Sequence, residues 1–242
     1  MSANPPPGAG RCFSEQVNAA FRELVLSPQF PCLGAKAALN SDSATLNVFD
    51  ELGSAASTDA LAAALSKFTS SVGRDAVEPG VTDYASFIAV FERPRQTNET
   101  EFERLLWKQL RLLHEHDAKR FDWNNRVASD PADPHFSFSF GGRALYVIGM
   151  HANSSRAARR FPWPMLVFNP HEQFERLRSD GKWKRMQESI RQRDLELQGS
   201  INPMLSDFGK QSEARQYSGR AVEENWRAPF KAAAPAKCPF AH

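Results

Sequence analysis

Apolar and polar positions alternate most regularly over residues 136–140, where phenylalanine and serine exchange at every step. A period of two is typical of a β-strand with one buried face. Gly141 and Gly142 follow directly, and such a pair suits a type I′ hairpin turn, because both central residues of that turn need positive φ. The apolar run that ends residues 143–150 then reads as the returning strand. The pattern therefore predicts a β-hairpin over residues 136–150.

Hydrophobic spacing also predicts most of the remaining elements. Segments with apolar positions at helical spacing are 14–26, 58–72, 98–113 and 182–197. Short apolar runs expected to be strands are 45–49, 84–91 and 165–168. Pro170-His171 opens a further helix, and a short helix over 156–160 is expected after Ser154-Ser155. Because strands and helices alternate irregularly around one hairpin, we expect a single α+β domain with a mainly antiparallel sheet and flanking helices.

The composition at the two ends of the chain predicts tails. Residues 1–12 are rich in Pro, Gly and Ala and are expected to be disordered. Residues 231–242 are rich in Pro and Ala and are expected to form a C-terminal tail. The single domain then spans residues 13–230.

The overall composition narrows the class of protein. The 242 residues are 41% apolar, enough for a real hydrophobic core, and their net charge is +2. A net charge so near zero does not indicate binding to nucleic acid or to a membrane surface. The N-terminus lacks the basic and apolar parts of a signal peptide, and no apolar run approaches the ~20 residues of a membrane span. We expect a cytoplasmic protein that binds neither nucleic acid nor membranes.

Two histidines follow strand segments, where rigid scaffolds often present functional side chains. His151 comes directly after the apolar run 145–150, and His171 follows the run 165–168. Neutral imidazole is the commonest metal ligand, but a histidine at a strand end more often satisfies a nearby backbone group. The pattern by itself leaves both roles open.

Arginines and cysteines complete the candidate chemistry. Arg156, Arg159 and Arg160 suit either a solvated helix face or the paired oxygens of a carboxylate, a phosphate or haem propionates. The cysteines, at positions 12, 32 and 238, are too few and too far apart to indicate a disulfide framework or a zinc site. No nucleophile-elbow, P-loop, dinucleotide-binding or zinc-protease motif is present.

Six sequence blocks in a fixed order resemble the YqcI/YcgG family. The resemblance runs over nearly the whole chain, from Phe30-Pro31-Cys32 to Cys238-Pro239-Phe240. Each block is weakly specific alone, but their number and order are distinctive. The blocks are LLWKQLRLLHEHD at 105–117, FSFSFGGRALYVIGMH at 136–151, SSRAARRF at 154–161, LVFNPHEQFERLR at 166–178, GSINPMLSDFG at 199–209 and SEARQYSGR at 212–220.

This resemblance implies a haem-dependent oxygenase. Characterised relatives hydroxylate a guanidine or amine nitrogen of a small polar substrate such as L-arginine, using O2 and reducing equivalents. An imidazole would hold the iron, and His151 is the first candidate, ahead of His171, Cys32 and Cys238. The chain has no Cys-x-x-Cys-His motif, so haem b would be bound non-covalently.

The resemblance also implies roles for charged residues. The candidates for binding the cofactor beside His151 are Arg156, Arg159, Arg160 and His171. A guanidinium substrate calls for a carboxylate partner, and the candidates for this catalytic role are Asp50, Glu51 and Asp117. A haem-binding carrier or sensor without catalysis is the alternative function.

Overall fold

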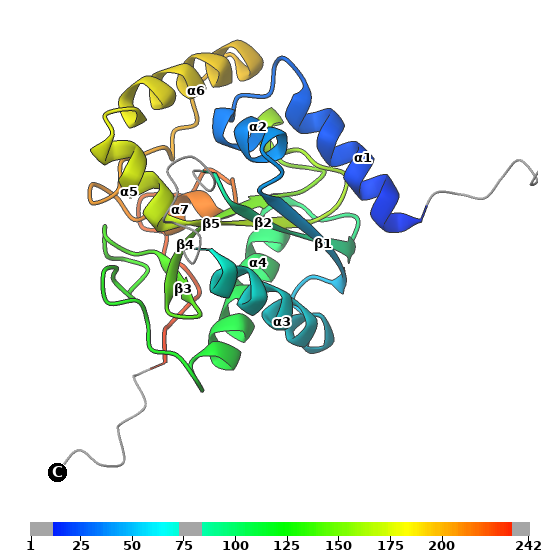
Figure 1. The fold of residues 1–242 in the computed structure, drawn as a ribbon, viewed down its shortest axis with the longest axis vertical. Helices are drawn as coiled ribbons and strands as arrows, with labels where there is room; N and C mark the ends of the chain where they lie inside the picture. The colour runs from blue at the N-terminus through cyan, green and yellow to red at the C-terminus, as the bar shows by residue number, and fades with distance from the viewer. Residues whose placement is uncertain (1–11, 73–83, 234–242) are drawn as a thin grey trace, which may run out of the picture.

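The computed structural model describes residues 12–72 and 84–233 (Figure 1). These residues fold around one five-stranded sheet with helices on both faces, which confirms the predicted α+β class. The expected tail at 1–12 lies almost entirely outside the described residues, as does most of the one at 231–242.

The sheet has the strand order β1-β2-β5-β4-β3. Its strands are β1 (Ala44–Glu51), β2 (Ser86–Arg93), β3 (Phe138–Phe140), β4 (Arg143–Met150) and β5 (Met165–Pro170). Three of the four strand pairings are antiparallel, as predicted for most of the sheet. The exception is the parallel pair of β1 and β2, which a helix separates in the sequence, and a parallel pair needs such a crossover connection.

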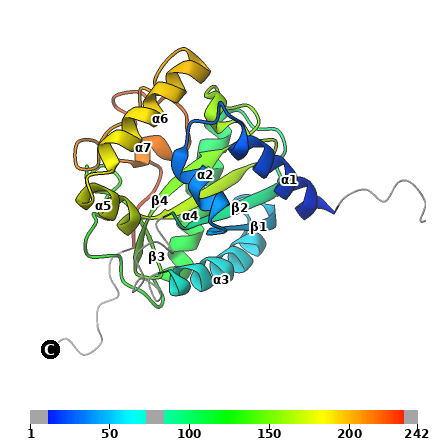
Figure 2. The same cartoon turned by 45° about the horizontal axis from the view of Figure 1, so that its top comes forward.

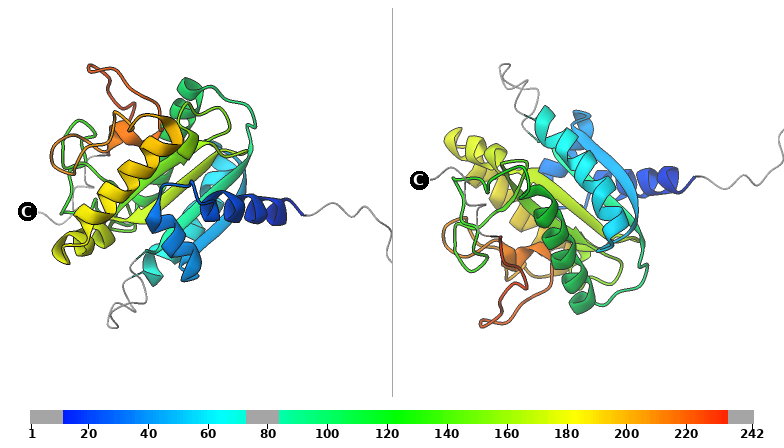
Figure 3. Two further views of the ribbon diagram at one scale, coloured as in Figure 1. Left: turned by 90° about the horizontal axis from the view of Figure 1, so that it is seen from above. Right: turned by 90° about the horizontal axis from the view of Figure 1, so that it is seen from below.

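Helices cover the two faces of the sheet unequally. The helices in the described residues are α1 (Phe13–Leu26), α2 (Leu33–Asn40), α3 (Ala55–Ser71), α4 (Glu99–Asp117), α5 (His171–Ser179), α6 (Trp183–Gln198) and α7 (Ala214–Tyr217). Helices α3 and α4 lie across one face, whereas α1, α2 and α6 lie on the other (Figures 2 and 3). The short helix expected over 156–160 is only a single 3₁₀ turn, Ala157–Arg159.

The predicted hairpin joins β3 and β4. Gly141 and Gly142 have φ values of 61° and 69°, as a type I′ turn requires. Phe140 pairs with Arg143 across the turn. The Gly141 N–H also donates to both carboxylate oxygens of Asp117, each at 3.0 Å, so the end of α4 holds the turn in place.

The larger hydrophobic core lies between the sheet and helices α3 and α4. Trp107 of α4 is buried in it, with the ring centroids of Tyr217 and Phe230 at 5.6 and 6.0 Å. Just beyond Phe230, the Ala233 N–H donates to His114 Nε2 at 2.7 Å. The packed chain therefore continues at least to residue 233, past the boundary expected at 230.

Candidate functional site

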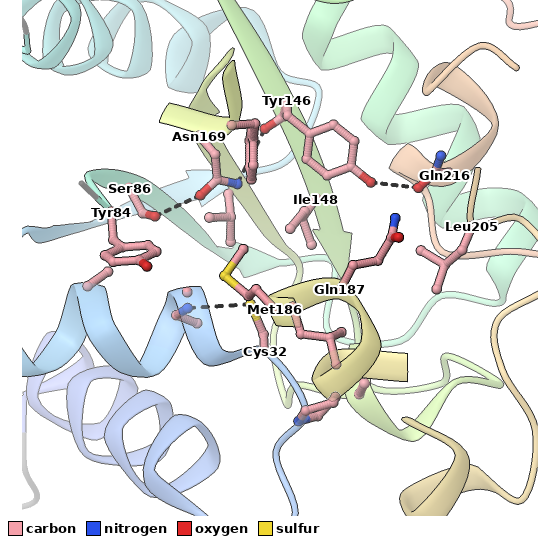
Figure 4. Close-up of a pocket in the computed structure, with 18 of the residues that line it drawn as sticks. Cys32, Tyr84, Ser86, Tyr146, Ile148, Asn169, Met186, Gln187, Leu205 and Gln216 are labelled. Atoms are coloured by element: carbon pink, nitrogen blue, oxygen red, sulfur yellow. Dashed lines mark hydrogen bonds between the residues drawn. The ribbon is translucent and has the colours of Figure 1, made fainter. Parts of the chain in front are cut away.

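A cavity of about 300 Å³ opens on the face of the sheet that carries α1, α2 and α6 (Figure 4). The central strands form its floor, and α2, α5, α6 and the loop around 202–211 contribute to its walls. Strand β4 gives Tyr146 and Ile148 to this floor, whereas Leu145 and Val147 point into the opposite core. Alternate residues of a strand face opposite sides, so this register decides which side chains of β4 can meet a ligand.

Two hydrogen-bonded pairs of side chains place polar groups in the cavity lining. Ser86 Oγ donates to Asn169 Oδ1 at 2.7 Å, linking β2 to the end of β5. Tyr146 Oη donates to Gln216 Oε1 at 2.8 Å, linking β4 to α7. Figure 4 shows these pairs among apolar side chains, which include Ile148, Met186 and Leu205. A cavity that is mostly apolar with a few fixed polar groups is the usual form of a small-molecule site.

Cys32 places a thiol in the cavity wall at the N-terminus of α2. Its Sγ accepts a hydrogen bond from the Ala35 N–H at 3.4 Å, so the thiol caps the helix. Burial raises the pKa of Cys32, while the amides of Ala35 and Gly34 and the charge of Arg159 act to lower it. The thiol is therefore neutral in the free protein, but its surroundings favour a thiolate once a metal offsets the cost of burial.

Arg156 lines the cavity with its charge already neutralised. Its Nη2 lies 2.6 Å from Asp194 Oδ2 on α6 and 2.7 Å from the Ser200 carbonyl oxygen. Both side chains of the ion pair are nearly buried. The pair ties the segment after β4 to the end of α6 and so shapes the cavity wall.

Arg159 lines the cavity without a carboxylate partner among the described residues. Its guanidinium donates to the carbonyl oxygens of Gly149 at 2.9 Å and Gln216 at 3.3 Å. Burial lowers its pKa. Arg160 does not line the cavity, because its guanidinium donates to the carbonyl oxygens of Ser154 and Ser155 instead. The predicted arginine cluster therefore brings two of its three members to the site.

His171 lines the cavity from the first turn of α5. Its side chain is 4% exposed, and neither ring nitrogen has a hydrogen-bond partner. The ring lies edge-on to Phe208, with centroids 4.5 Å apart. Burial, and then the positive charge of Arg178, lower the pKa of His171 to about 4, so the imidazole is neutral at pH 7.

His151 lies away from the cavity. Its ring stacks on Phe102 of α4 at a centroid distance of 4.4 Å, and its Nδ1 is 3.5 Å from Thr97 Oγ1. Met150 faces the cavity, so the next residue along the chain faces the α4 side. The sequence does not show on which side of the sheet the His151 side chain lies. Its position outside the cavity argues against His151 as a ligand there.

The carboxylates expected to bind the substrate also lie elsewhere. Asp50 and Glu51 end the edge strand β1 and pair with Arg93, at 2.7 and 3.9 Å. Asp117 holds the hairpin turn through Gly141, and burial raises its pKa to about 6. None of the three lines the cavity.

Asp194 and Glu213 are the carboxylates that do line it, and sequence reasoning assigned a role to neither. Glu213 is 5% exposed and accepts a hydrogen bond from Tyr217 Oη at 2.6 Å. Burial raises its pKa to about 8. The sequence signal for Glu213 is the block SEARQYSGR at 212–220, which supports the family resemblance, whereas Asp194 lies outside all six blocks.

Within residues 12–72 and 84–233, no three side chains of His, Cys, Asp or Glu are grouped to hold a metal ion. Over the same ranges, no helix combines the length and apolar character of a membrane span.

Comparison with known proteins gives consistent matches over most of the chain. Two relatives from Bacillus subtilis (strain 168) are named uncharacterized protein YqcI and uncharacterized protein YcgG. YqcI is 28% identical and YcgG 25% identical, each over 88% of this chain and about 80% of the relative. No solved structure gives a significant match. The model of the YqcI/YcgG family matches residues 21–231, which covers nearly all of the described residues, and the chain therefore belongs to the YqcI/YcgG family.

Proposed function

We propose that the cavity binds haem b without a covalent link and that the protein is a haem-dependent oxygenase acting on a guanidine or amine nitrogen. One observation carries the cofactor: the thiol of Cys32 lies at a helix N-terminus in the wall of an apolar cavity that is also lined by arginines. The reaction follows from the resemblance of the sequence blocks to haem-dependent N-hydroxylases.

Cys32 is the better of the two candidate iron ligands that line the cavity. The Ala35 N–H and the N-terminal end of α2 are groups that stabilise a thiolate. Iron binds the deprotonated thiol, which offsets the effect of burial on its pKa. A ligating histidine normally donates its second ring N–H to a protein group, and His171 has no such partner.

Arg159 is the cation best placed for a haem propionate or a substrate carboxylate. Arg156 is already paired with Asp194 at 2.6 Å, whereas Arg159 donates only to carbonyl oxygens. A guanidinium suits a carboxylate because it offers two parallel donors. An anion at this point would also neutralise a buried positive charge.

The chain supplies binding, orientation and exclusion of water. When bound, haem supplies the activation of O2. In the net reaction one oxygen atom is inserted into an N–H bond to give N–OH, and the other leaves as water, with two electrons and two protons from an external donor. The apolar walls around Ile148, Met186 and Leu205 keep bulk water from the reacting nitrogen.

The cofactor proposal is tested with cysteine variants and absorption spectra. Wild-type protein supplemented with haem is expected to bind it stoichiometrically, and its ferrous carbon monoxide complex should absorb at the long wavelength typical of a thiolate ligand. Cys32→Ala should lose haem or this spectral feature. Cys12→Ala, at an exposed thiol, and His151→Ala, outside the cavity, should keep both. A Cys32→Ala protein with full haem and an unchanged spectrum would overturn the ligand.

The reaction is tested by mass spectrometry of a panel of amines and guanidines incubated with haem-loaded protein, O2 and a reductant. L-arginine or a related guanidine is expected to gain one oxygen atom on nitrogen. Stoichiometric haem without turnover of any panel member would instead favour the carrier or sensor function.

A further inference from the structure

We propose that Glu213 determines specificity by binding the cationic guanidinium or ammonium end of the substrate. This inference rests on the proposed function only in taking the occupant of the cavity to be the substrate. It replaces the three carboxylates expected from sequence, since Asp50, Glu51 and Asp117 all lie outside the cavity.

Glu213 has the geometry of a preformed cation site. It lines the cavity just before α7, is 5% exposed and makes no ion pair with any arginine, lysine or histidine in the part of the chain that the structure describes. Tyr217 Oη accepts the Phe138 N–H at 3.0 Å and donates to Glu213 Oε1 at 2.6 Å. The strand thus orients the tyrosine, and the tyrosine orients the carboxyl group.

Asp194, the other carboxylate that lines the cavity, already forms an ion pair. Asp194 Oδ2 lies 2.6 Å from Arg156 Nη2 and accepts the Asn202 N–H at 3.0 Å. An incoming cation would have to break this buried ion pair in order to bind there. Glu213 is therefore the cavity carboxylate that can gain a cation without losing one.

Buried polar atoms without hydrogen-bond partners occur in the same cavity. Neither ring nitrogen of His171 nor the Oε1 atom of Gln173 has a hydrogen-bond partner, and both side chains are 4% exposed. Buried polar atoms are normally hydrogen-bonded, so these atoms are available to bind a ligand. A neutral imidazole and an amide oxygen both accept hydrogen bonds, which suits a ligand rich in N–H donors.

The charge state of Glu213 supports this geometry. Burial raises its pKa to about 8, so the free protein holds it largely protonated at pH 7. The side chains of Tyr217 and Ser137 and the charge of Arg178 act to lower this pKa, and Tyr146 and His171 line the same cavity. Both tyrosines have raised pKa values and His171 is neutral, so among Tyr146, Tyr217, His171 and Glu213 only Glu213 titrates between pH 6 and 8.

Cation binding should therefore displace a proton from Glu213. Below pH 8 the affinity for a cationic ligand should rise by up to about tenfold per pH unit, and above pH 8 it should level off. A neutral ligand of the same shape should show no such dependence.

The experiment is isothermal titration calorimetry of the protein with L-arginine and with L-citrulline, its uncharged isostere. Titrations between pH 6 and 9, in buffers of different ionisation enthalpy, report the number of protons released. Glu213→Gln is the informative variant, because the amide mimics the protonated acid and can still accept from Tyr217. Glu172→Gln is the matched control, since it removes a carboxylate beside His171 that does not line the cavity.

Wild type and Glu172→Gln are expected to bind L-arginine with proton release, and at least about tenfold more tightly than L-citrulline. Glu213→Gln should lose this preference and the pH dependence. Equal binding of L-arginine by wild type and Glu213→Gln, binding by wild type without proton release, or no binding of L-arginine by wild type would each overturn the proposal. Haem uptake is measured separately, so a protein that fails to bind added haem but still shows these effects refutes the proposed cofactor and not the role of Glu213.

Discussion

Asp117 shows how a single residue can stabilise a turn and still weaken the fold at neutral pH. Its carboxylate accepts the Gly141 N–H, but burial raises its pKa from 3.8 to about 6. A carboxyl group whose pKa is higher in the folded state stabilises the fold fully below its unfolded pKa. That contribution is lost as the pH rises through the folded value.

The variant Asp117→Asn keeps the acceptor and removes the ionisation. Relative to wild type, its free energy of unfolding should therefore improve by on the order of 2 kcal/mol between pH 4 and pH 7. Urea unfolding at both pH values measures this difference. Asp59→Asn, at an exposed position on α3, serves as the control. A difference between Asp117→Asn and wild type that does not change with pH would contradict the expectation.

At the scale of elements, strand β4 lies between the hydrophobic core beside α4 and the cavity. One face of the strand packs against α4, and the other forms part of the cavity floor. Gly149 lies at a close approach of α4 and α7 to the strand, because a Cβ atom there would lie 2.7 Å from the Leu106 and Phe102 side chains and 2.8 Å from the Tyr217 carbonyl oxygen. The glycine lets the helices approach.

Gly149→Ala is expected to lower the free energy of unfolding by at least ~2 kcal/mol, because a backbone oxygen and two core side chains would have to move. Gly34→Ala is the comparison, since a Cβ there meets Tyr84 at an ordinary 3.6 Å and alanine favours the helix. Chemical denaturation of both proteins gives the result. Equal stability of the two variants would show that β4 can shift to accommodate the methyl group.

At the scale of the whole molecule, the segment around Phe230 covers the hydrophobic core on the α4 side of the sheet. Phe230 is 8% exposed and packs among Trp107, Trp123 and Phe138, with centroid distances of 6.0 to 6.2 Å. This core supports the strands whose other faces line the cavity (Figure 4). Loss of the segment would therefore act on the cavity indirectly.

Phe230→Ala should cost about 3–5 kcal/mol of unfolding free energy, as for other large buried aromatic side chains. Phe121→Ala, at a side chain that is 47% exposed, should change stability by less than about 0.5 kcal/mol. Thermal and urea unfolding measure both. A small effect at Phe230 would mean that the segment packs loosely on a core that is complete without it.

Local patterns determined the elements because the interactions behind them span only a few residues. The double glycine and the alternation before it gave the hairpin, and the Asn98 side chain caps the start of α4 by accepting the Glu101 N–H at 2.8 Å. The same kind of reasoning placed His171 at the start of a helix.

Only the tertiary structure decided which of these side chains meet. Strand β4 is apolar on both faces, so its sequence could not show that Tyr146 faces a cavity while His151 faces α4. Cys32 and Glu213 are 181 positions apart in the chain, yet they line one cavity, because the folded sheet brings the starts of α2 and α7 to the same place. Residues that are neighbours in the sequence determine which segments form strands and helices. A site depends instead on which faces of these elements the order of the strands brings together.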